Sequence, residues 1–262
     1  MHSKTTHHDI RKNIFSAITF SLLVLSMGCA KSGQFPGTSS SDSNQSAGIV
    51  EPTPTPSPSP TVSPTPSPTP SYKMAALVWE SFSKPERAQW SAYLQDIILN
   101  KWNTLLAGAD DMADFCPNYS KLSNDQRANT WAQLFAAMAK YESAWSPTSR
   151  MQETTMGTDP ITGRPVYSEG LLQLSYQDIT GWPFCEFDWQ KDKNLSSTDP
   201  KKTILDPYKN LYCGVGIMAK QITKKGLIKI GSGAYWAVLK TNSQYNKITS
   251  IESIVKTLSF CK

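Results

Sequence analysis

Histidine is almost absent from this chain of 262 residues, and its three copies, His2, His7 and His8, all lie at the N-terminus. The rest of the chain therefore has no imidazole ligand, which argues against a zinc enzyme. Long runs of lysine and arginine are also missing, and the formal net charge is only +5, which argues against a nucleic-acid partner. We therefore expect no metal, no cofactor and no nucleic acid.

One hydrophobic run, Ile14–Met27, follows a basic stretch near the N-terminus. It is too short for a transmembrane helix, which needs roughly 20 residues, and it is typical of a signal peptide. Gly28 and Cys29 follow the run directly and resemble the end of a bacterial lipobox. This resemblance implies a lipoprotein signal peptide over 1–28 with lipidation of Cys29. Ala30 comes next, which by the same resemblance favours the outer membrane. The alternative is an ordinary secretory signal with an incidental cysteine.

A low-complexity segment, 29–72, comes after the signal peptide. Its first part is rich in Ser, Gly and Asn, and nine of the 18 prolines of the chain lie in the Pro-Thr/Pro-Ser repeat between Glu51 and Tyr72. Such a composition cannot bury a core, and the repeat should form extended polyproline II that reaches on the order of 60 Å. We expect a disordered tether between a membrane anchor and a folded domain; a passive linker is the alternative.

The remaining segment, 73–262, is long enough to form one hydrophobic core. An even number of cysteines behind an export signal predicts two disulfides in an oxidising compartment. Three pairings are open, because sequence alone does not fix the connectivity. The four disulfide candidates are Cys116, Cys185, Cys213 and Cys261.

Helical periodicity dominates this segment. Ser123 and Gln126 form a potential capping box ahead of an Ala-rich helix. Strand signals are weak, and the Gly/Pro/Thr-rich loop Thr154–Tyr167 has room for a short hairpin. We therefore predict a mainly α fold with a small hairpin excursion. The expected helical stretches are Trp79–Leu106 (broken near Pro85), Ala128–Tyr141, Tyr208–Thr223 and Ile251–Phe260.

One carboxylate lies at an unusual position on the Ala-rich helix. Trp131, Phe135 and Met138 share one helix face, and Glu142 is the next residue on that face. Desolvating a carboxylate costs several kcal/mol, so an acid at the edge of a core should have a raised pKa, as a general acid requires near neutral pH. The alternative is a frayed helix end at which Glu142 points into water.

The residues around Glu142 form a recognisable motif. Tyr141–Pro147 (YESAWSP) resembles the catalytic-glutamate motif of soluble lytic transglycosylases and goose-type lysozymes, and Gly170–Leu174 (GLLQL) resembles the Gly-Leu-Met-Gln segment that follows it. Asp206–Gly214 and Ala234-Tyr235 resemble two later motifs of this family. The resemblance implies a lysozyme-like fold that cleaves the β-1,4 bonds of peptidoglycan glycan strands, with Glu142 as the general acid.

A second acid distinguishes the two reactions of this family. A lytic transglycosylase uses one glutamate and forms 1,6-anhydro ends, whereas an inverting hydrolase needs a second carboxylate roughly 6.5–9.5 Å away to activate water. The insertion Arg150–Ser168 is longer than the family pattern and supplies Glu153, with Asp159 as the rival base. We predict a hydrolase, a muramidase, with Glu142 and Glu153 as catalytic residues. The residues expected to bind substrate are Ser143, Gln173, Tyr176, Tyr235, Asp159 and Glu169.

Charge is distributed unevenly along the folded segment. From Glu142 to Asp188 there are seven acidic and two basic residues, whereas from Trp189 onward there are 13 lysines and four acids. A negative cleft concentrates cationic ligands, and de-N-acetylated amino sugars carry an ammonium group. We therefore hypothesise a preference for de-N-acetylated glycan.

Two non-catalytic functions compete with the enzyme. The first is a glycan-binding lipoprotein on the same fold in which Glu142 is a relic, and the second is a structural tether. In each case we expect an exported monomer that is lipid-anchored at the outer membrane, facing the periplasm, or secreted. Its partners would be the membrane, through the lipid anchor, and peptidoglycan or a related amino-sugar polymer.

Overall fold

The structure is a computed structural model that describes residues 72–81 and 84–262. The predicted signal peptide 1–28, the predicted lipidation site Cys29 and the predicted tether up to residue 71 lie outside the described residues. The described part belongs to one folded unit, Pro70–Lys262. None of its helices combines the length and the apolar character needed to cross a membrane.

Helices dominate the described residues, as the periodicity predicts, and one small antiparallel sheet accompanies them. In the sheet, β1 (Arg150–Gln152) pairs with β2 (Tyr167–Glu169), so that Met151 lies opposite Ser168. The mainly α class with a small β excursion is therefore confirmed. The α-helices are α1 (Glu86–Asn100), α2 (Met112–Phe115), α3 (Asn124–Ser143), α4 (Asp178–Gly181), α5 (Trp189–Asp192), α6 (Pro207–Lys225) and α7 (Ile248–Val255).

Short 3₁₀ helices connect several of these elements, and they account for most departures from the predicted boundaries. They are Val78–Ser81, Asn103–Ala107, Tyr119–Lys121, Thr203–Leu205, Ala237–Leu239 and Ser259–Cys261. The predicted last helix is interrupted, because α7 ends at Val255 and a 3₁₀ turn follows it at Ser259. The hairpin is longer than the loop Thr154–Tyr167 predicts: pairing begins at Arg150, β2 begins at Tyr167, and an isolated antiparallel bridge joins Thr158 to Pro165 inside the loop.

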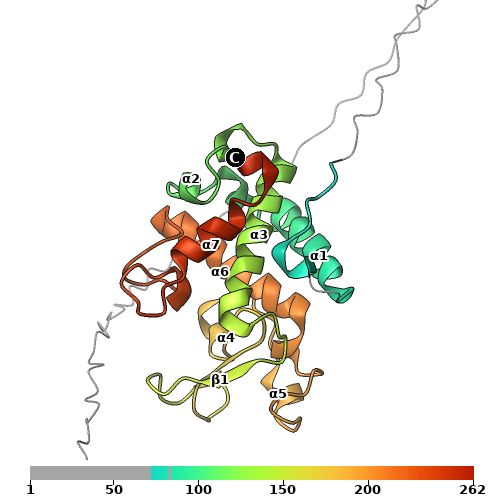
Figure 1. Ribbon diagram of the computed structural model, residues 1–262. Helices are drawn as coiled ribbons and strands as arrows, with labels where there is room; N and C mark the ends of the chain where they lie inside the picture. The colour runs from blue at the N-terminus through green and yellow to red at the C-terminus, as the bar shows by residue number, and fades with distance from the viewer. Residues whose placement is uncertain (1–71, 82–83) are drawn as a thin grey trace, which may run out of the picture. The chain divides into compact units, whose positions relative to one another are not determined.

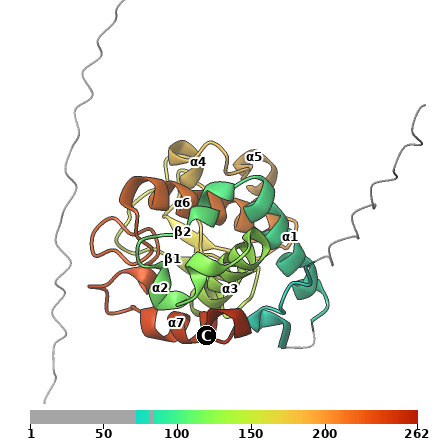
Figure 2. The same ribbon diagram turned by 90° about the horizontal axis from the view of Figure 1, so that it is seen from above.

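Helix α3 lies at the centre of the domain, and Figure 1 shows α1 and α7 on opposite sides of it. Figure 2 shows α6 on the side of α3 that faces away from α7. The capping box is present: Ser123 Oγ accepts from the Gln126 N–H, and the Gln126 side chain accepts from the Ser123 N–H. Every residue from Ala128 to Ala139 is buried. A helix that is enclosed on all sides needs small and apolar residues around its whole circumference, which explains its alanines.

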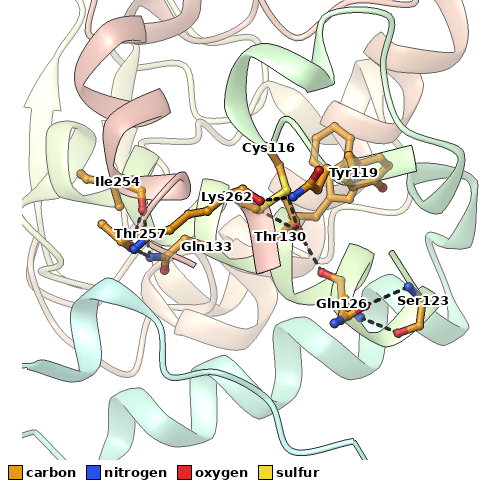
Figure 3. Close-up of a disulfide and its surroundings, with 12 residues drawn as sticks. Cys116, Tyr119, Ser123, Gln126, Thr130, Gln133, Ile254, Thr257 and Lys262 are labelled. Carbon is orange, nitrogen blue, oxygen red and sulfur yellow. Dashed lines mark hydrogen bonds between the residues drawn. A yellow bond between two sulfur atoms is a disulfide. The ribbon is translucent and has the colours of Figure 1, made fainter. Parts of the chain in front are cut away.

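Two disulfides join segments of the domain that are distant in sequence. Cys116 pairs with Cys261 and Cys185 pairs with Cys213, so the two predicted disulfides are confirmed and their pairing is settled. Figure 3 shows the first bond beside Thr130 of α3. Nearby, the Gln133 amide donates to the Ile254 carbonyl at 3.3 Å. The C-terminal segment is therefore held covalently to the segment before α3 and by hydrogen bonds to α3 itself.

Candidate functional site

Helix α3 ends in an unusual turn that determines where Glu142 lies. Ala144 and Trp145 follow the helix with φ values of 50° and 61°, a left-handed region that costs free energy for residues other than glycine. The Trp145 indole N–H donates to the Ala136 carbonyl at 2.8 Å and holds the ring against the helix. The helix stops one residue after Glu142, and its last turn faces the hairpin that follows in the chain.

Backbone strain is concentrated at two of the motif segments. Among the non-glycine residues that the structure describes, only Ala144, Trp145 and Gln173 have a positive φ. The first two end the catalytic-glutamate motif, and the third lies within Gly170–Leu174. Strained conformations persist only where the surrounding structure holds them in place, and they cluster at functional sites.

Three other segments, which contain or directly follow the remaining motifs, contact Gly170–Leu174 and the residue before it. The Ser143 hydroxyl donates to the Leu171 carbonyl at 2.9 Å, and the Trp236 indole N–H donates to the Leu172 carbonyl at 2.9 Å. From α6, the buried Asn210 side chain accepts from the Leu172 N–H at 2.8 Å and donates to the Glu169 carbonyl at 3.1 Å. Segments far apart in sequence therefore build one framework around the end of α3.

Two glycines make this close packing possible. A Cβ at Gly170 would lie 2.3 Å from Asn210 Nδ2, and the φ of Gly170 is +81°. A Cβ at Gly214 of α6 would lie 2.3 Å from Leu172 Cδ1. Both distances are far below van der Waals contact, so these positions require glycine.

Glu142 is partly buried at the end of α3, and its Oε1 atom is buried without a hydrogen-bond partner among the described residues. Burial, and after it the negative charge of Glu153, raises the pKa of Glu142 to about 8. A carboxyl group with this pKa is mostly protonated at neutral pH. This is the protonation state that a general acid needs.

Glu153 lies just after β1, eleven residues beyond Glu142 in the sequence. Its backbone N–H donates to the Val166 carbonyl at 2.9 Å, and its Oε1 accepts from the Ser168 hydroxyl at 2.6 Å. Because β2 carries Ser168, the hairpin fixes the position of this carboxylate. Its charge acts on Glu142, so the structure brings the two predicted catalytic residues together.

Tyr235, from the C-terminal part of the chain, lies close enough to these two glutamates for their charges to act on it. Burial raises the pKa of its hydroxyl, and the negative charges of Asp178, Glu142 and Glu153 raise it further. The hydroxyl donates to Asp178 Oδ2 at 2.5 Å. The ring packs edge-on against Trp182 and Trp236, so the phenol is fixed beside both glutamates.

In the sequence, Asp178 stands out only as one member of the acidic stretch Glu142–Asp188. Its side chain is buried, and burial raises its pKa to about 6 against the lowering effect of hydrogen bonds from Tyr235 and the Ser175 N–H. The partner that gives Asp178 its significance is 57 residues away in the sequence. No local pattern links the two residues.

Comparison with solved structures adds one decisive observation. The chain is similar to Bd0314 DslA. The wild-type structure of that Bdellovibrio protein has 29% sequence identity to this chain and a TM-score of 0.60, covering 73% of this chain and 100% of the other. No protein-family model and no curated protein sequence matches the chain.

Two variants of Bd0314 DslA carry single glutamate-to-glutamine replacements, and they match with 28% and 29% identity and TM-scores of 0.59 and 0.58. The two replaced glutamates are eleven residues apart in that protein. Glu142 and Glu153 have the same separation here. Replacement of an acid by its isosteric amide is a standard way to probe a catalytic carboxyl group, so the comparison points to an enzyme with functional glutamates.

The Asp159 carboxylate holds the hairpin loop together. Its Oδ1 accepts from the N–H groups of Ile161 and Thr162, and its Oδ2 accepts from the Gln177 N–H and the Ser175 hydroxyl. The side chain is 2% exposed. A carboxylate with four donors around it is poorly placed to take a proton from water, so Glu153 is the better supported base.

Glu169 and Tyr176 also make their polar contacts inside the protein. Glu169 forms a buried ion pair with Lys202 and lies 3.5 Å from Arg150. The Tyr176 hydroxyl donates to Asp192 Oδ2 at 2.8 Å. These residues line a cavity of about 80 Å³ beside β2, whose lining includes neither Glu142 nor Glu153. Contact of Glu169 and Tyr176 with a glycan stays a prediction.

Ser143 and Gln173 hold the framework of the site. Both are buried, and the Gln173 amide donates to the Gly170 carbonyl at 2.9 Å. Tyr235 is the one residue among the six predicted substrate-binding residues that is both partly exposed and electrostatically coupled to Glu142. No group of three or more possible metal ligands occurs in the described part of the chain. The candidate site thus consists of Glu142, Glu153 and Tyr235, and its two glutamates have the same separation as those replaced in Bd0314 DslA.

Proposed function

We propose that this protein is a lysozyme-like glycoside hydrolase that cleaves β-1,4 bonds in peptidoglycan glycan strands. The observation that carries the proposal is a partly buried Glu142 with a pKa of about 8, which is raised by burial and by the charge of a second carboxylate, Glu153. The hairpin holds this second carboxylate by a 2.6 Å hydrogen bond. One group is kept protonated by burial and the other is fixed nearby. This is the division of roles that acid–base cleavage of a glycosidic bond requires.

The chemistry follows from these positions. Glu142 donates its proton to the glycosidic oxygen as the bond to the leaving sugar breaks. Glu153 accepts a proton from a water molecule, which attacks the anomeric carbon. The water oxygen becomes the new hydroxyl of that carbon, and the product has a free reducing end. Ser168 keeps the Glu153 carboxylate in place during the reaction.

The second carboxylate is the reason for favouring hydrolysis over transglycosylation. A lytic transglycosylase needs no base for water, because the muramyl 6-hydroxyl attacks in its place. The equal glutamate spacing in the variants of Bd0314 DslA supports a role for both residues. The acidic stretch Glu142–Asp188 supports the further proposal that de-N-acetylated glycan, which carries ammonium groups, is preferred.

We also propose the setting in which the enzyme acts. The signal peptide 1–28 exports the chain, lipidated Cys29 anchors it to a membrane, and the tether 29–72 lets a monomeric domain reach the wall. Incubation of cells with labelled palmitate tests this directly, with Cys29→Ser as the control that should lose the label. A wild-type chain that takes up no label contradicts the anchor.

Glu142→Gln tests the proposed activity. We expect the rate of wall cleavage to fall by roughly 10²- to 10⁴-fold, with binding to the wall retained, because the amide cannot donate a proton to the leaving oxygen. Glu186→Gln is the matched control, since it makes the same side-chain replacement at an exposed position. Mass spectrometry of the wild-type products should show reducing ends. Products with 1,6-anhydro ends would indicate a transglycosylase, and full activity of Glu142→Gln would contradict catalysis by this residue.

A further inference from the structure

Asp178 is a buried acid for which the proposed reaction has no direct use. Its side chain is 6% exposed at the first residue of α4. Its Oδ2 accepts two hydrogen bonds, one from the Ser175 N–H at 2.7 Å and one from the Tyr235 hydroxyl at 2.5 Å. Burying a carboxylate is costly unless it is hydrogen-bonded, so its link to Tyr235 calls for an explanation.

The position of the Tyr235 ring is fixed independently of Asp178. The ring centroid lies 5.4 Å from that of Trp182 and 4.7 Å from that of Trp236, in edge-on contact with both. Trp236 is itself anchored by its indole N–H to the Leu172 carbonyl. What remains free is the rotation of the hydroxyl proton, and Asp178 determines its direction.

The direction of this proton decides what Tyr235 offers to a ligand. A phenol has one proton and two lone pairs. When the proton points at Asp178, the oxygen has only lone pairs left for any other partner. The other charged groups that act on this oxygen are Glu142 and Glu153. The hydroxyl therefore presents a hydrogen-bond acceptor on the side of the two glutamates.

We propose that Asp178 is a positioning residue that acts through Tyr235: it locks the Tyr235 hydroxyl as an acceptor, so that the site selects a sugar group carrying N–H or O–H donors beside the bond to be cleaved. The inference rests on the proposed glycan-cleaving function. A sugar ammonium group supplies three donors. An acetamido group supplies a single neutral N–H, and its carbonyl can only accept, so it makes a weaker hydrogen bond to this oxygen than the charged ammonium does.

A double-mutant cycle on the full-length mature chain tests this role. In Asp178→Ser the side chain is too short to reach the phenol, which releases the Tyr235 proton to point at the ligand, while the serine hydroxyl can still accept from the Ser175 N–H. Tyr235→Phe removes the hydroxyl altogether. We expect each single change to lower kcat/KM by roughly tenfold, and the double variant to be no worse than Tyr235→Phe, because Asp178 acts only through that hydroxyl.

A second readout separates positioning from a loss of folding. The ratio of rates on de-N-acetylated and N-acetylated wall should fall in Asp178→Ser and Tyr235→Phe, and it should stay unchanged in the Glu186→Gln control. Circular dichroism and urea unfolding check that each variant is folded. If Asp178→Ser does not fold, Asp178→Thr replaces it, since its hydroxyl is equally short and can also accept from the Ser175 N–H.

The outcomes distinguish this inference from the proposed function. Suppose that the wild-type activity depends on Glu142. Additive losses in the double variant, or an unchanged substrate ratio, then overturn the role of Asp178 and leave the hydrolase intact. A wild-type chain that cleaves no glycan overturns both proposals together. Non-additive losses with a lowered ratio support the assignment.

Discussion

At the scale of single residues, the site depends on how differently burial acts on chemically similar acids. Glu142 is partly buried, has a hydrogen-bond acceptor atom with no partner, and its pKa rises to about 8. Asp159 is more deeply buried, but four protein donors surround its carboxylate. Hydrogen bonding thus gives Asp159 a structural role, whereas burial without a partner for Oε1 favours the protonated form of Glu142.

The pH dependence of activity follows from the pKa of Glu142. A general acid works only when protonated, so kcat/KM should fall as the pH rises above about 8. Because Glu153 raises this pKa, Glu153→Gln should lower the pKa of Glu142, which ¹³C NMR of labelled glutamate carboxyl groups measures without any need for activity. Glu186→Gln should leave it unchanged. An identical Glu142 pKa in wild type and Glu153→Gln would show that the two carboxylates are not coupled.

At the scale of elements, local signals were sufficient for α3 and insufficient for the hairpin. The capping box at Ser123 and Gln126 is a contact within one turn, so sequence spacing predicts it directly. The hairpin was expected within Thr154–Tyr167, but β1 lies before that loop and β2 begins only at its last residue, with a single bridge, Thr158 to Pro165, inside it. Strands of three residues have too little alternation to locate, and Asp159 organises the loop through contacts with residues up to 18 positions away.

The capping box should contribute measurably to stability. Ser123→Ala removes the acceptor for the Gln126 N–H, and we expect the free energy of unfolding to fall by about 1 kcal/mol. Ser120→Ala is a matched control, because Ser120 is an exposed serine that precedes the cap by three residues. Urea denaturation followed by circular dichroism measures both. Equal effects of the two changes would show that the cap contributes nothing specific.

At the scale of the whole molecule, the disulfides connect parts of the chain that the sequence cannot relate. Cys116 and Cys261 are separated by 145 residues, and Cys185 and Cys213 by 28. The first joins the segment before α3 to the C-terminus, and the second joins the loop after α4 to α6. Together with the contacts of Asn210, they hold in place the helices that surround Gly170–Leu174.

The two disulfides should differ in their contribution to stability. Closing a longer loop removes more entropy from the unfolded chain, so the C116S/C261S variant should lose about 1.5 kcal/mol more of its free energy of unfolding than C185S/C213S. Urea denaturation of both variants under identical conditions provides the comparison, and each serves as the control for the other. An equal or reversed order would show that local contacts outweigh loop closure.

The sequence by itself determined the helical character of the domain, the start of α3, and the position of Glu142 near the end of that helix. These features depend on periodicity and capping within a few residues, which act before any tertiary contact forms. Only the tertiary structure decided the disulfide pairing, the support of Glu153 by Ser168, the burial of Glu169 against Lys202, and the link between Asp178 and Tyr235. Each of these joins residues between 15 and 145 positions apart, and such contacts arise only when the packed core brings their elements together.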